Sequence, residues 1–473
     1  MPKLKSKEIG VYLVLLSTLY FVFYQHLDSF HILNWDESMF AVNACEMINN
    51  NDLIGLFYKN VPDLFNTKPP MQVWLQVLFI KLIGYNELAI RLPSALASSF
   101  SALLLFYFIR KRHSLIFALC VFFVFVTSLG VATFHTGRTG DADALLAFLI
   151  VCYCVSFYKW LFENKSVSLF YFFVFLTLAF LTKSIAALLF MPALLIVVLY
   201  FKKISLLFKD KWFYIGFILF AATSIGYLFL RNVSNPGYIN TLINNDAGRY
   251  NTVLDSHEAP FDFYFNGLYE ERFKWIILLL PGVLLMWFNS KLRPATVFLF
   301  VLFISYFIVL SGSVSKAAWY DLPLYPILSI FCGYTLYVLI MKFNSNQIHF
   351  LNAAMLFFIF VTPLYFTFRN SYKSEIKPGD KKLEILNEYA FRNKNNQSLN
   401  NVTFLTIYND RPLYFYKYKL NAKGLDFNVT NSLDSLKENN LVIVAEDSLK
   451  NAVLKKYKCI IIDEYKSVLK VKI

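Results

Sequence analysis

The sequence predicts an all-α polytopic membrane protein with about eleven spanning helices, followed by a small water-soluble α/β domain. Two observations carry this prediction. Of the 473 residues, 57% are hydrophobic and only 16% are charged, whereas a soluble globular chain carries roughly 25% charged residues. The character then changes in 375–473, where Lys and Asn are frequent and short apolar runs alternate with polar ones. We therefore expect a membrane domain at 1–370 and a second domain at 371–473.

Apolar stretches recur along the predicted membrane domain, and most are long enough to cross the hydrocarbon core. The predicted spans are 9–30, 88–109, 114–134, 143–162, 168–182, 184–201, 212–230, 273–289, 295–311, 318–341 and 348–368. The stretch 72–84 is apolar but short, so we expect a re-entrant or interfacial helix there. The first stretch follows three lysines, as in a signal peptide, but no small-residue cleavage site follows it. We expect a retained first span.

Basic segments predict the orientation of these spans. Short connections rich in Lys and Arg lie at 3–7, 110–112, 202–211 and 291–293. Alternating the spans places all four on one side, which the positive-inside rule makes cytoplasmic. The N-terminus is then cytoplasmic in the inner membrane, and the other connections and the C-terminal domain face outward. This bias explains the net charge of +14, and no motif points to nucleic acid.

The final domain, 371–473, combines predicted strands and helices. Apolar runs at 402–407, 441–444 and 459–462 are typical of short buried strands. The intervening segments 380–392, 432–438 and 447–456 are expected to be helices. The domain has no glycine-rich phosphate loop, so we expect a lid or docking module rather than a second active site.

Two motifs fall in the first predicted outer loop, 31–87. Asp36 and Glu37 are adjacent carboxylates at the mouth of a span, where charge is costly. They suit either a functional site or the N-terminus of the following helix. Lys68 precedes two prolines, which stiffen the segment. A cation presented in this way suits a phosphate, and contact with lipid headgroups is the alternative.

Later outer connections add further polar residues. Asp143 places another carboxylate on the outer side, with Asp141 as the expected helix cap. A lone lysine such as Lys183 can simply snorkel to the interface, and a lone histidine is usually structural. The other candidates are Arg249, His257, Lys316 and Tyr320. Because the chemistry gathers on one face and a transporter keeps polar groups near the midplane, the pattern favours an interfacial enzyme.

These motifs together resemble a known family. The series Asp36-Glu37, Lys68-Pro69-Pro70 and Arg91-Leu92-Pro93 is similar to the start of the GT-C glycosyltransferases. The branch is that of the bacterial lipid A aminoarabinose transferases and the protein O-mannosyltransferases. The resemblance covers about residues 10–340. Further residues follow in the family's order: Asp143-Ala144-Leu145-Leu146, Leu181-Thr182-Lys183, His257, Lys316 and Tyr320.

The resemblance implies a GT-C fold and an activity. The donor would be a sugar linked to polyprenyl phosphate, and transfer would proceed with inversion on the outer face of the membrane. The acceptor would be a cell-envelope lipid, a glycan or a protein. A transporter or flippase of a lipid-linked substrate is the alternative, which an inverted repeat would favour, and a non-catalytic scaffold is a third hypothesis.

The resemblance also assigns roles to residues. Asp36 would be the catalytic carboxylate, with Glu37 beside it and Asp143 as the second acidic residue. His257 would take part in binding a divalent metal. Thr67 departs from the pattern, because some members carry there a glutamate that partners the metal-bound histidine. The residues expected to face the donor phosphate or the acceptor are Lys68, Lys183, Arg249, Lys316 and Tyr320.

Overall fold

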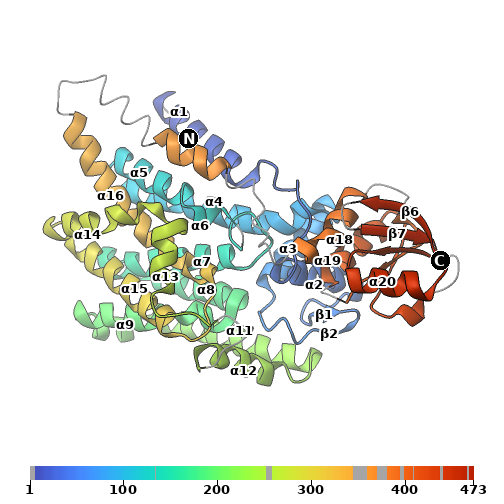
Figure 1. Cartoon of the computed structure of the whole chain (residues 1–473). Coiled ribbons are helices and arrows are strands. Elements are labelled where there is room, and N and C mark those ends of the chain that lie inside the picture. Colours follow the sequence, from blue (N-terminus) through green and yellow to red (C-terminus); the bar gives the residue numbers. More distant parts are fainter. Residues whose placement is uncertain are drawn as a thin grey trace. The chain divides into compact units, whose positions relative to one another are not determined.

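The computed structural model divides into two compact units (Figure 1). The first comprises Met1–Gln25, Leu64–Gln72 and Ser94–Lys373, and the second comprises His26–Asp63, Val73–Pro93 and Ser374–Ile473. The chain alternates between them, whereas the two predicted domains, 1–370 and 371–473, are consecutive in the sequence. The structure describes residues 6–133, 135–251, 258–344, 360–369, 381–394, 399–407, 410–436, 440–465 and 468–472.

Apolar helices build the first unit. Its main helices are α1 (Ser6–Leu19), α4 (Glu87–Arg112), which begins in the second unit, α5 (Leu115–Val126), α6 (Leu129–Ala132), α7 (Asp143–Glu163), α8 (Val167–Lys183), α9 (Met191–Tyr200), α10 (Ile204–Lys209), α11 (Lys211–Ser234), α12 (Tyr238–Asn251), α13 (Phe263–Gly267), α14 (Leu279–Phe288), α15 (Arg293–Gly312) and α16 (Tyr325–Asn344). Short π or 3₁₀ turns extend several of them: η1 (Tyr20–Tyr24), η2 (Ser184–Leu188), η3 (Leu268–Arg272), η4 (Lys274–Leu278) and η5 (Ala318–Leu324).

Six helices within the described residues are long and apolar enough to cross a membrane. They are Glu87–Arg112, Asp143–Glu163, Val167–Leu188, Lys211–Ser234, Arg293–Gly312 and Ala318–Lys342. Four of the other five predicted spans, 9–30, 114–134, 184–201 and 273–289, coincide with shorter apolar helices, so the count of about eleven stays a prediction. Most of the predicted span 348–368 lies outside the described residues, and a helix occupies 360–369.

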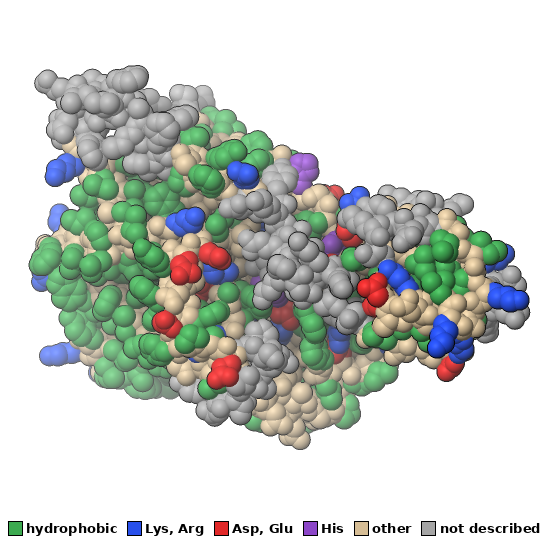
Figure 2. Space-filling model, in the orientation of Figure 1, with side chains coloured by type: hydrophobic (Ala, Val, Ile, Leu, Met, Phe, Trp, Pro, Cys, Tyr) green, Lys and Arg blue, Asp and Glu red, His purple; other side chains and the backbone are tan. Residues whose placement is uncertain are grey.

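The exposed surface of the first unit is strongly apolar. On α11, only 17% of the apolar window is buried inside the protein. Large side chains such as Ile218, Ile225 and Phe229 are each about two-thirds exposed. Figure 2 shows hydrophobic side chains covering much of the visible face of the helices. Hydrocarbon accepts such side chains without the cost that water imposes, so this surface suits a bilayer.

Close approach between α14 and α16 depends on a glycine. A Cβ atom at Gly282 would lie 2.1 Å from the carbonyl oxygen of Phe331. That oxygen belongs to a helix backbone, which cannot turn aside as a side chain can. By contrast, nothing lies within 4 Å of a Cβ at Gly226 on α11.

We expect Gly282→Ala to destabilise the protein by about 1–3 kcal/mol, because the added methyl group forces the two helices apart. Gly226→Ala is the matched control and should leave stability unchanged or slightly raised, since alanine is the better helix former. Thermal unfolding in detergent would compare the two variants. Equal midpoints would show that the α14–α16 contact is not tight.

A five-stranded sheet lies in the second unit, with the strand order β4-β3-β5-β7-β6. The strands are β3 (Val402–Leu405), β4 (Asn428–Thr430), β5 (Leu441–Val444), β6 (Ile460–Tyr465) and β7 (Val468–Lys472). β3 pairs in parallel with β4 and β5, whereas β7 pairs antiparallel with β5 and β6. Helix α20 (Asp447–Lys456) packs Leu449 and Val453 onto this sheet.

The three strands predicted from the C-terminal sequence are present, as are two of the three helices, α18 (Lys381–Arg392) and α20. At 432–438 only a short 3₁₀ turn, Leu433–Ser435, forms. Helix α19 (Arg411–Asn421) and strands β4 and β7 were not predicted. The unit also contains α2 (Asp36–Asn50), β1 (Phe57–Tyr58), β2 (Val61–Pro62) and most of α3 (Met71–Ile83).

Buried polar pairs join distant segments within the second unit. The Glu87 carboxylate accepts from Lys419 at 2.6 Å, and Asp63 accepts from Arg411 at 2.7 Å. His31 Nε2 lies 2.9 Å from a Glu384 carboxylate oxygen. A buried carboxylate without a cation would carry a large desolvation penalty. These pairs therefore hold the C-terminal segment on residues 26–93, which explains why the units are interleaved in the sequence.

Candidate active site

One cavity of the first unit brings together four of the predicted site residues. Lys68, Asp143, Lys183 and Tyr320 all line it. The rest of its wall is mainly apolar, with Leu146, Ile185, Ala186, Leu189, Val309, Leu310 and Pro323. We call it the lysine cavity. Charged groups at one place and hydrocarbon around them are what a lipid with a phosphate head requires.

Helices α7 and α8 position the central pair of this cavity. They form a hairpin, so Asp143 at the start of α7 and Lys183 at the end of α8 meet although they are 40 residues apart. The Lys183 ammonium donates to Asp143 Oδ1 at 2.6 Å and lies 4.5 Å from the centre of the Tyr320 ring. Both side chains are largely buried. Snorkelling therefore does not describe Lys183, which faces inward to a carboxylate.

The segment that carries Lys68 is held by its neighbours. The Lys68 backbone N–H donates to Asn66 Oδ1 at 3.1 Å. The Tyr238 hydroxyl donates to the Thr67 carbonyl at 3.0 Å, and the Arg231 guanidinium lies 5.0 Å from the Tyr238 ring. Arg231 is completely buried. Arg231 is not among the predicted site residues, and its only sequence signal is an arginine near the end of an otherwise apolar stretch.

Strained backbone lies directly beside two candidate residues, Lys183 and Asp36. Ser184, directly after Lys183, has φ 27° and ψ −114°. Trp35, directly before Asp36, has φ 69° and ψ −123°. These angles are close to those of the first central residue of a type II′ turn, a conformation that glycine dominates. Strain of this kind persists where the surroundings impose it and clusters at functional sites.

Asp36 and Glu37 belong to the second unit and open helix α2. Arg91 is completely buried and donates to the two Glu37 carboxylate oxygens at 2.7 and 3.0 Å. It also donates to three carbonyl groups in the preceding turn, among them His31 at 2.7 Å. The Asp36 side chain is half-buried beside this network. The expectation that these carboxylates favour a helix N-terminus fits α2, and Arg91 fixes the turn that presents Asp36.

We expect Arg91→Ala to cost about 3–5 kcal/mol of stability, because it leaves the buried Glu37 carboxylate without its cation. Arg392→Ala is the control, since Arg392 makes an exposed i,i+4 pair with Glu388 that is worth only about 0.3–0.5 kcal/mol. Denaturant unfolding of the two variants would measure the difference. If both midpoints fell equally, the Glu37–Arg91 pair would not be a buried anchor.

Lys316, Arg249 and His257 are the remaining predicted residues. The Lys316 ammonium donates to the carbonyl of Ala259 at 2.8 Å and to that of Ser313, and burial lowers its pKa. It ties the segments around Ala259 and Ser313 together and does not line the lysine cavity, although Ser315 does. Arg249 lies on α12, and its side chain is not described. His257 lies outside the described residues.

Asp141 does not cap α7 as expected. The cap position is Ala142, without a side-chain hydrogen bond. Asp141 instead accepts from Thr139 and lies 3.1 Å from His135 Nδ1. The His135 ring stacks on Trp319 with a centroid distance of 3.6 Å. An imidazole nitrogen and a carboxylate oxygen are ligand types that divalent transition metals accept.

A family model and several curated proteins match the chain. The model described as dolichyl-phosphate-mannose-protein mannosyltransferase matches residues 67–227. A putative mannosyltransferase, YycA, of Bacillus subtilis is 24% identical over 229 residues, 48% of this chain and 32% of that protein. An undecaprenyl phosphate-alpha-4-amino-4-deoxy-L-arabinose arabinosyl transferase of Aeromonas hydrophila is 26% identical over 319 residues, 64% of this chain and 56% of that protein. The chain thus matches about a third to a little over half of these relatives.

Solved structures match over more of the chain. ArnT from Cupriavidus metallidurans bound to undecaprenyl phosphate has a TM-score of 0.75 at 16% identity, covering 98% of both chains. The Archaeoglobus fulgidus oligosaccharyltransferase in its apo form has a TM-score of 0.56 at 12% identity, covering 91% of this chain and 65% of that chain. The predicted resemblance is confirmed at the level of architecture: the chain has the GT-C fold.

Proposed function

We propose that the chain is an inverting glycosyltransferase that moves a sugar from a polyprenyl-phosphate donor to a cell-envelope acceptor. The lysine cavity is the observation that carries this proposal. It combines a cationic group of side chains with an apolar wall, which matches a phosphate attached to a long hydrocarbon chain. The proposal locates the protein in the inner membrane, with the cavity on the extracytoplasmic side.

The related proteins support a lipid-phosphate donor. The Cupriavidus ArnT was solved with undecaprenyl phosphate bound, and an archaeal oligosaccharyltransferase was solved with a dolichol-phosphate. Their shared fold makes the same class of donor the simplest proposal here. Neither identifies the sugar or the acceptor of this chain, which we leave as an envelope lipid, a glycan or a protein.

The net positive charge of the lysine cavity suits a phosphate that gains negative charge as it leaves the sugar. Its charged lining residues are Lys68, Lys183 and Asp143, which leave one net positive charge. A sugar phosphodiester carries one negative charge, whereas the released phosphate monoester carries close to two at neutral pH. Cations placed where charge develops lower the barrier, because they hold the leaving group more strongly as the bond lengthens. We propose that Lys68 and Lys183 hold the phosphate and that Asp143 orients Lys183.

The transfer reaction needs one base, which takes up the proton of the acceptor hydroxyl. The acceptor oxygen attacks the anomeric carbon, and the bond from that carbon to the phosphate oxygen breaks. The electron pair leaves with the polyprenyl phosphate, and the acceptor proton passes to the Asp36 carboxylate. Attack opposite the leaving group inverts the anomeric centre. The role of Asp36 rests on the sequence resemblance and on the strained turn at Trp35.

The other predicted residues receive different proposals. Glu37 serves as a positioning residue, because both of its oxygens are held by Arg91. Tyr320 packs its ring beneath the Lys183 ammonium, while Lys316 secures an outer loop. Arg249 stays a candidate for contact with the donor or the acceptor. A divalent metal also stays a proposal; it would use His257, and His135 with Asp141 offers suitable ligand types in the first unit.

The direct test uses purified protein reconstituted in liposomes with a panel of polyprenyl-phosphate sugars and envelope acceptors. Release of polyprenyl phosphate together with a glycosylated acceptor would establish the activity, and the donor that responds would name the sugar. Movement of a labelled donor between leaflets is measured in the same liposomes. Movement without release from any donor would overturn the proposal and favour a flippase.

A further inference from the structure

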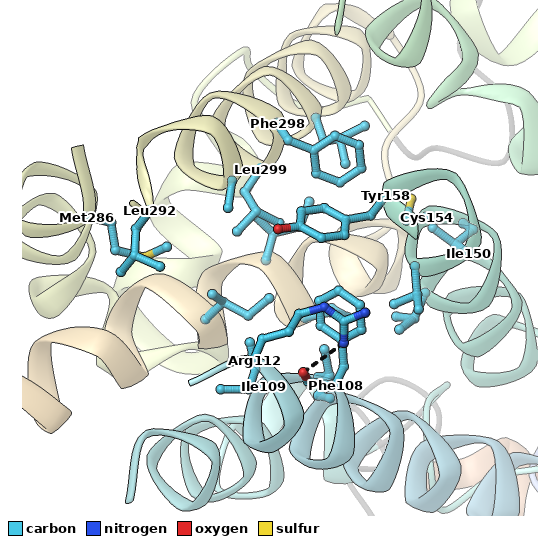
Figure 3. A pocket seen from close by; sticks show the side chains of 18 of the residues that line it. Phe108, Ile109, Arg112, Ile150, Cys154, Tyr158, Met286, Leu292, Phe298 and Leu299 are labelled. Atoms are coloured by element: carbon cyan, nitrogen blue, oxygen red, sulfur yellow. Dashed lines mark hydrogen bonds between the residues drawn. The ribbon is translucent and has the colours of Figure 1, made fainter. Parts of the chain in front are cut away.

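A second cavity of the first unit is lined almost wholly by hydrocarbon and shares one lining residue, Pro323, with the lysine cavity. Helices α4, α5, α7, α14, α15 and α16 contribute to its wall. Figure 3 shows aliphatic and aromatic side chains around it, including Ile150, Phe298 and Leu299. We call it the apolar cavity. Most of its wall suits hydrocarbon chains.

Charged groups gather at one end of the apolar cavity. Arg112 and His113 line it there, beside Tyr158. The Arg112 guanidinium stacks on the Phe108 ring at 3.6 Å and donates to the Phe108 carbonyl at 3.1 Å (Figure 3). Stacking holds the guanidinium plane still. Its Nε and Nη2 groups also donate to Glu163, so only the second N–H bonds of Nη1 and Nη2 are left for an anion.

Positive charge exceeds negative charge around this end. Arg112 pairs with Glu163, but Glu163 also pairs with Lys165 at 2.9 Å, so one carboxylate serves two cations. Lys159 lies one turn before Glu163 on the same face of α7. Further cations adjoin lining residues in the sequence: Lys111 precedes Arg112, and Lys291 and Arg293 flank Leu292. The end of the cavity is therefore short of negative charge.

We propose that the apolar cavity binds an anionic glycerophospholipid, with its acyl chains among α7, α15 and α16 and its phosphate at Arg112 and Lys159. Basic pockets between membrane helices recognise such headgroups. The cationic end coincides with the basic connection at 110–112, which the sequence analysis assigned to the cytoplasmic side. This site is separate from the proposed donor site and from the transfer reaction.

The far end of the apolar cavity reaches the lysine cavity. Pro323 lines both cavities. Phe190 lines the apolar cavity and stacks on Tyr306 at 4.5 Å, with an interplanar angle of 11°, and Tyr306 lines the lysine cavity. The bound acyl chains would thus end against the stacked pair that separates the two cavities. A lipid that fills the apolar cavity would therefore pack against Phe190 and help to hold the Phe190–Tyr306 pair in place.

Native mass spectrometry of the purified full chain would test the proposal, with phosphatidylglycerol and phosphatidylcholine as probes. We expect tight retention of one phosphatidylglycerol and weaker retention of phosphatidylcholine. Arg112→Gln and Lys159→Gln should each weaken phosphatidylglycerol binding about fivefold, the value of one cation near an anionic lipid. Lys209→Gln is the control, because it removes a cation from another predicted cytoplasmic segment that does not line this cavity.

A variant that leaves the charge unchanged tests the cavity independently of Arg112 and Lys159. Leu299→Trp fills the apolar cavity without changing charge and should abolish phosphatidylglycerol retention, while far-ultraviolet circular dichroism stays unchanged. Unchanged binding in Leu299→Trp, or equal retention of the two lipids by the wild type, would overturn the proposal. Displacement of phosphatidylglycerol by equimolar polyprenyl phosphate would also overturn it, since the cavity would then belong to the donor.

Discussion

Asp36→Asn should lower the rate of sugar transfer by about 10²–10⁴-fold, the usual contribution of a general base. Asparagine keeps the size of the side chain and its place at the start of α2, but it cannot take up a proton. Binding of polyprenyl phosphate should be unaffected, because Asp36 does not line the lysine cavity. Transfer from the donor that responds in the liposome panel would measure the rate.

Asp28→Asn provides the matched control for Asp36→Asn. Asp28 is an exposed carboxylate eight residues earlier, on the same segment of the second unit. We expect its substitution to leave transfer unchanged. If Asp36→Asn transferred sugar at the wild-type rate, Asp36 would not be the base.

Lys183→Met should reduce turnover by about 10²–10³-fold, as removal of one group that stabilises developing charge commonly does. Methionine has a similar length without the charge, so the leaving phosphate loses one cation. The variant also leaves the buried Asp143 carboxylate unpaired, which lowers stability. Turnover and unfolding must therefore be measured together.

A double variant separates these two effects of Lys183. Lys183→Met combined with Asp143→Asn removes the unpaired charge and should recover most of the stability lost in the single variant. Turnover should stay low, because no cation returns to the phosphate. Recovery of turnover with stability would mean that the Asp143–Lys183 pair only holds α7 to α8.

The bundle was largely predictable because its signal is local. Apolar stretches of sufficient length predict membrane helices from composition alone. The strands at 402–405 and 441–444 are predicted by short runs rich in β-branched residues. Asp143 and Lys183 were found because each borders an apolar stretch, and Lys68 was found because it precedes two prolines. That these three meet in one cavity depends on the α7–α8 hairpin and on the placement of Lys68, which composition does not encode.

Other features could not be predicted from the sequence, for a different reason. The strained conformations at Trp35 and Ser184 occur at residues other than glycine, so no sequence signal announced them. Arg231 was passed over because one arginine near the end of an apolar stretch also fits an interfacial anchor. The alternation of the chain between two units depends on pairs such as Glu87 with Lys419, which are 332 residues apart.

These long-range pairs have a consequence for how the protein is made. His31 and Glu384 are 353 residues apart, so at 5–20 residues per second roughly 20 to 70 s of translation separate the two partners. Glu37 can pair early with Arg91, which follows only 54 residues later. Asp63 and Glu87 pair with Arg411 and Lys419, which are synthesised much later. The nascent chain therefore carries an unfinished second unit throughout the insertion of its membrane helices. A ribosome that stalls before Arg411 would leave a fragment in which Asp63 lacks Arg411 and Glu87 lacks Lys419.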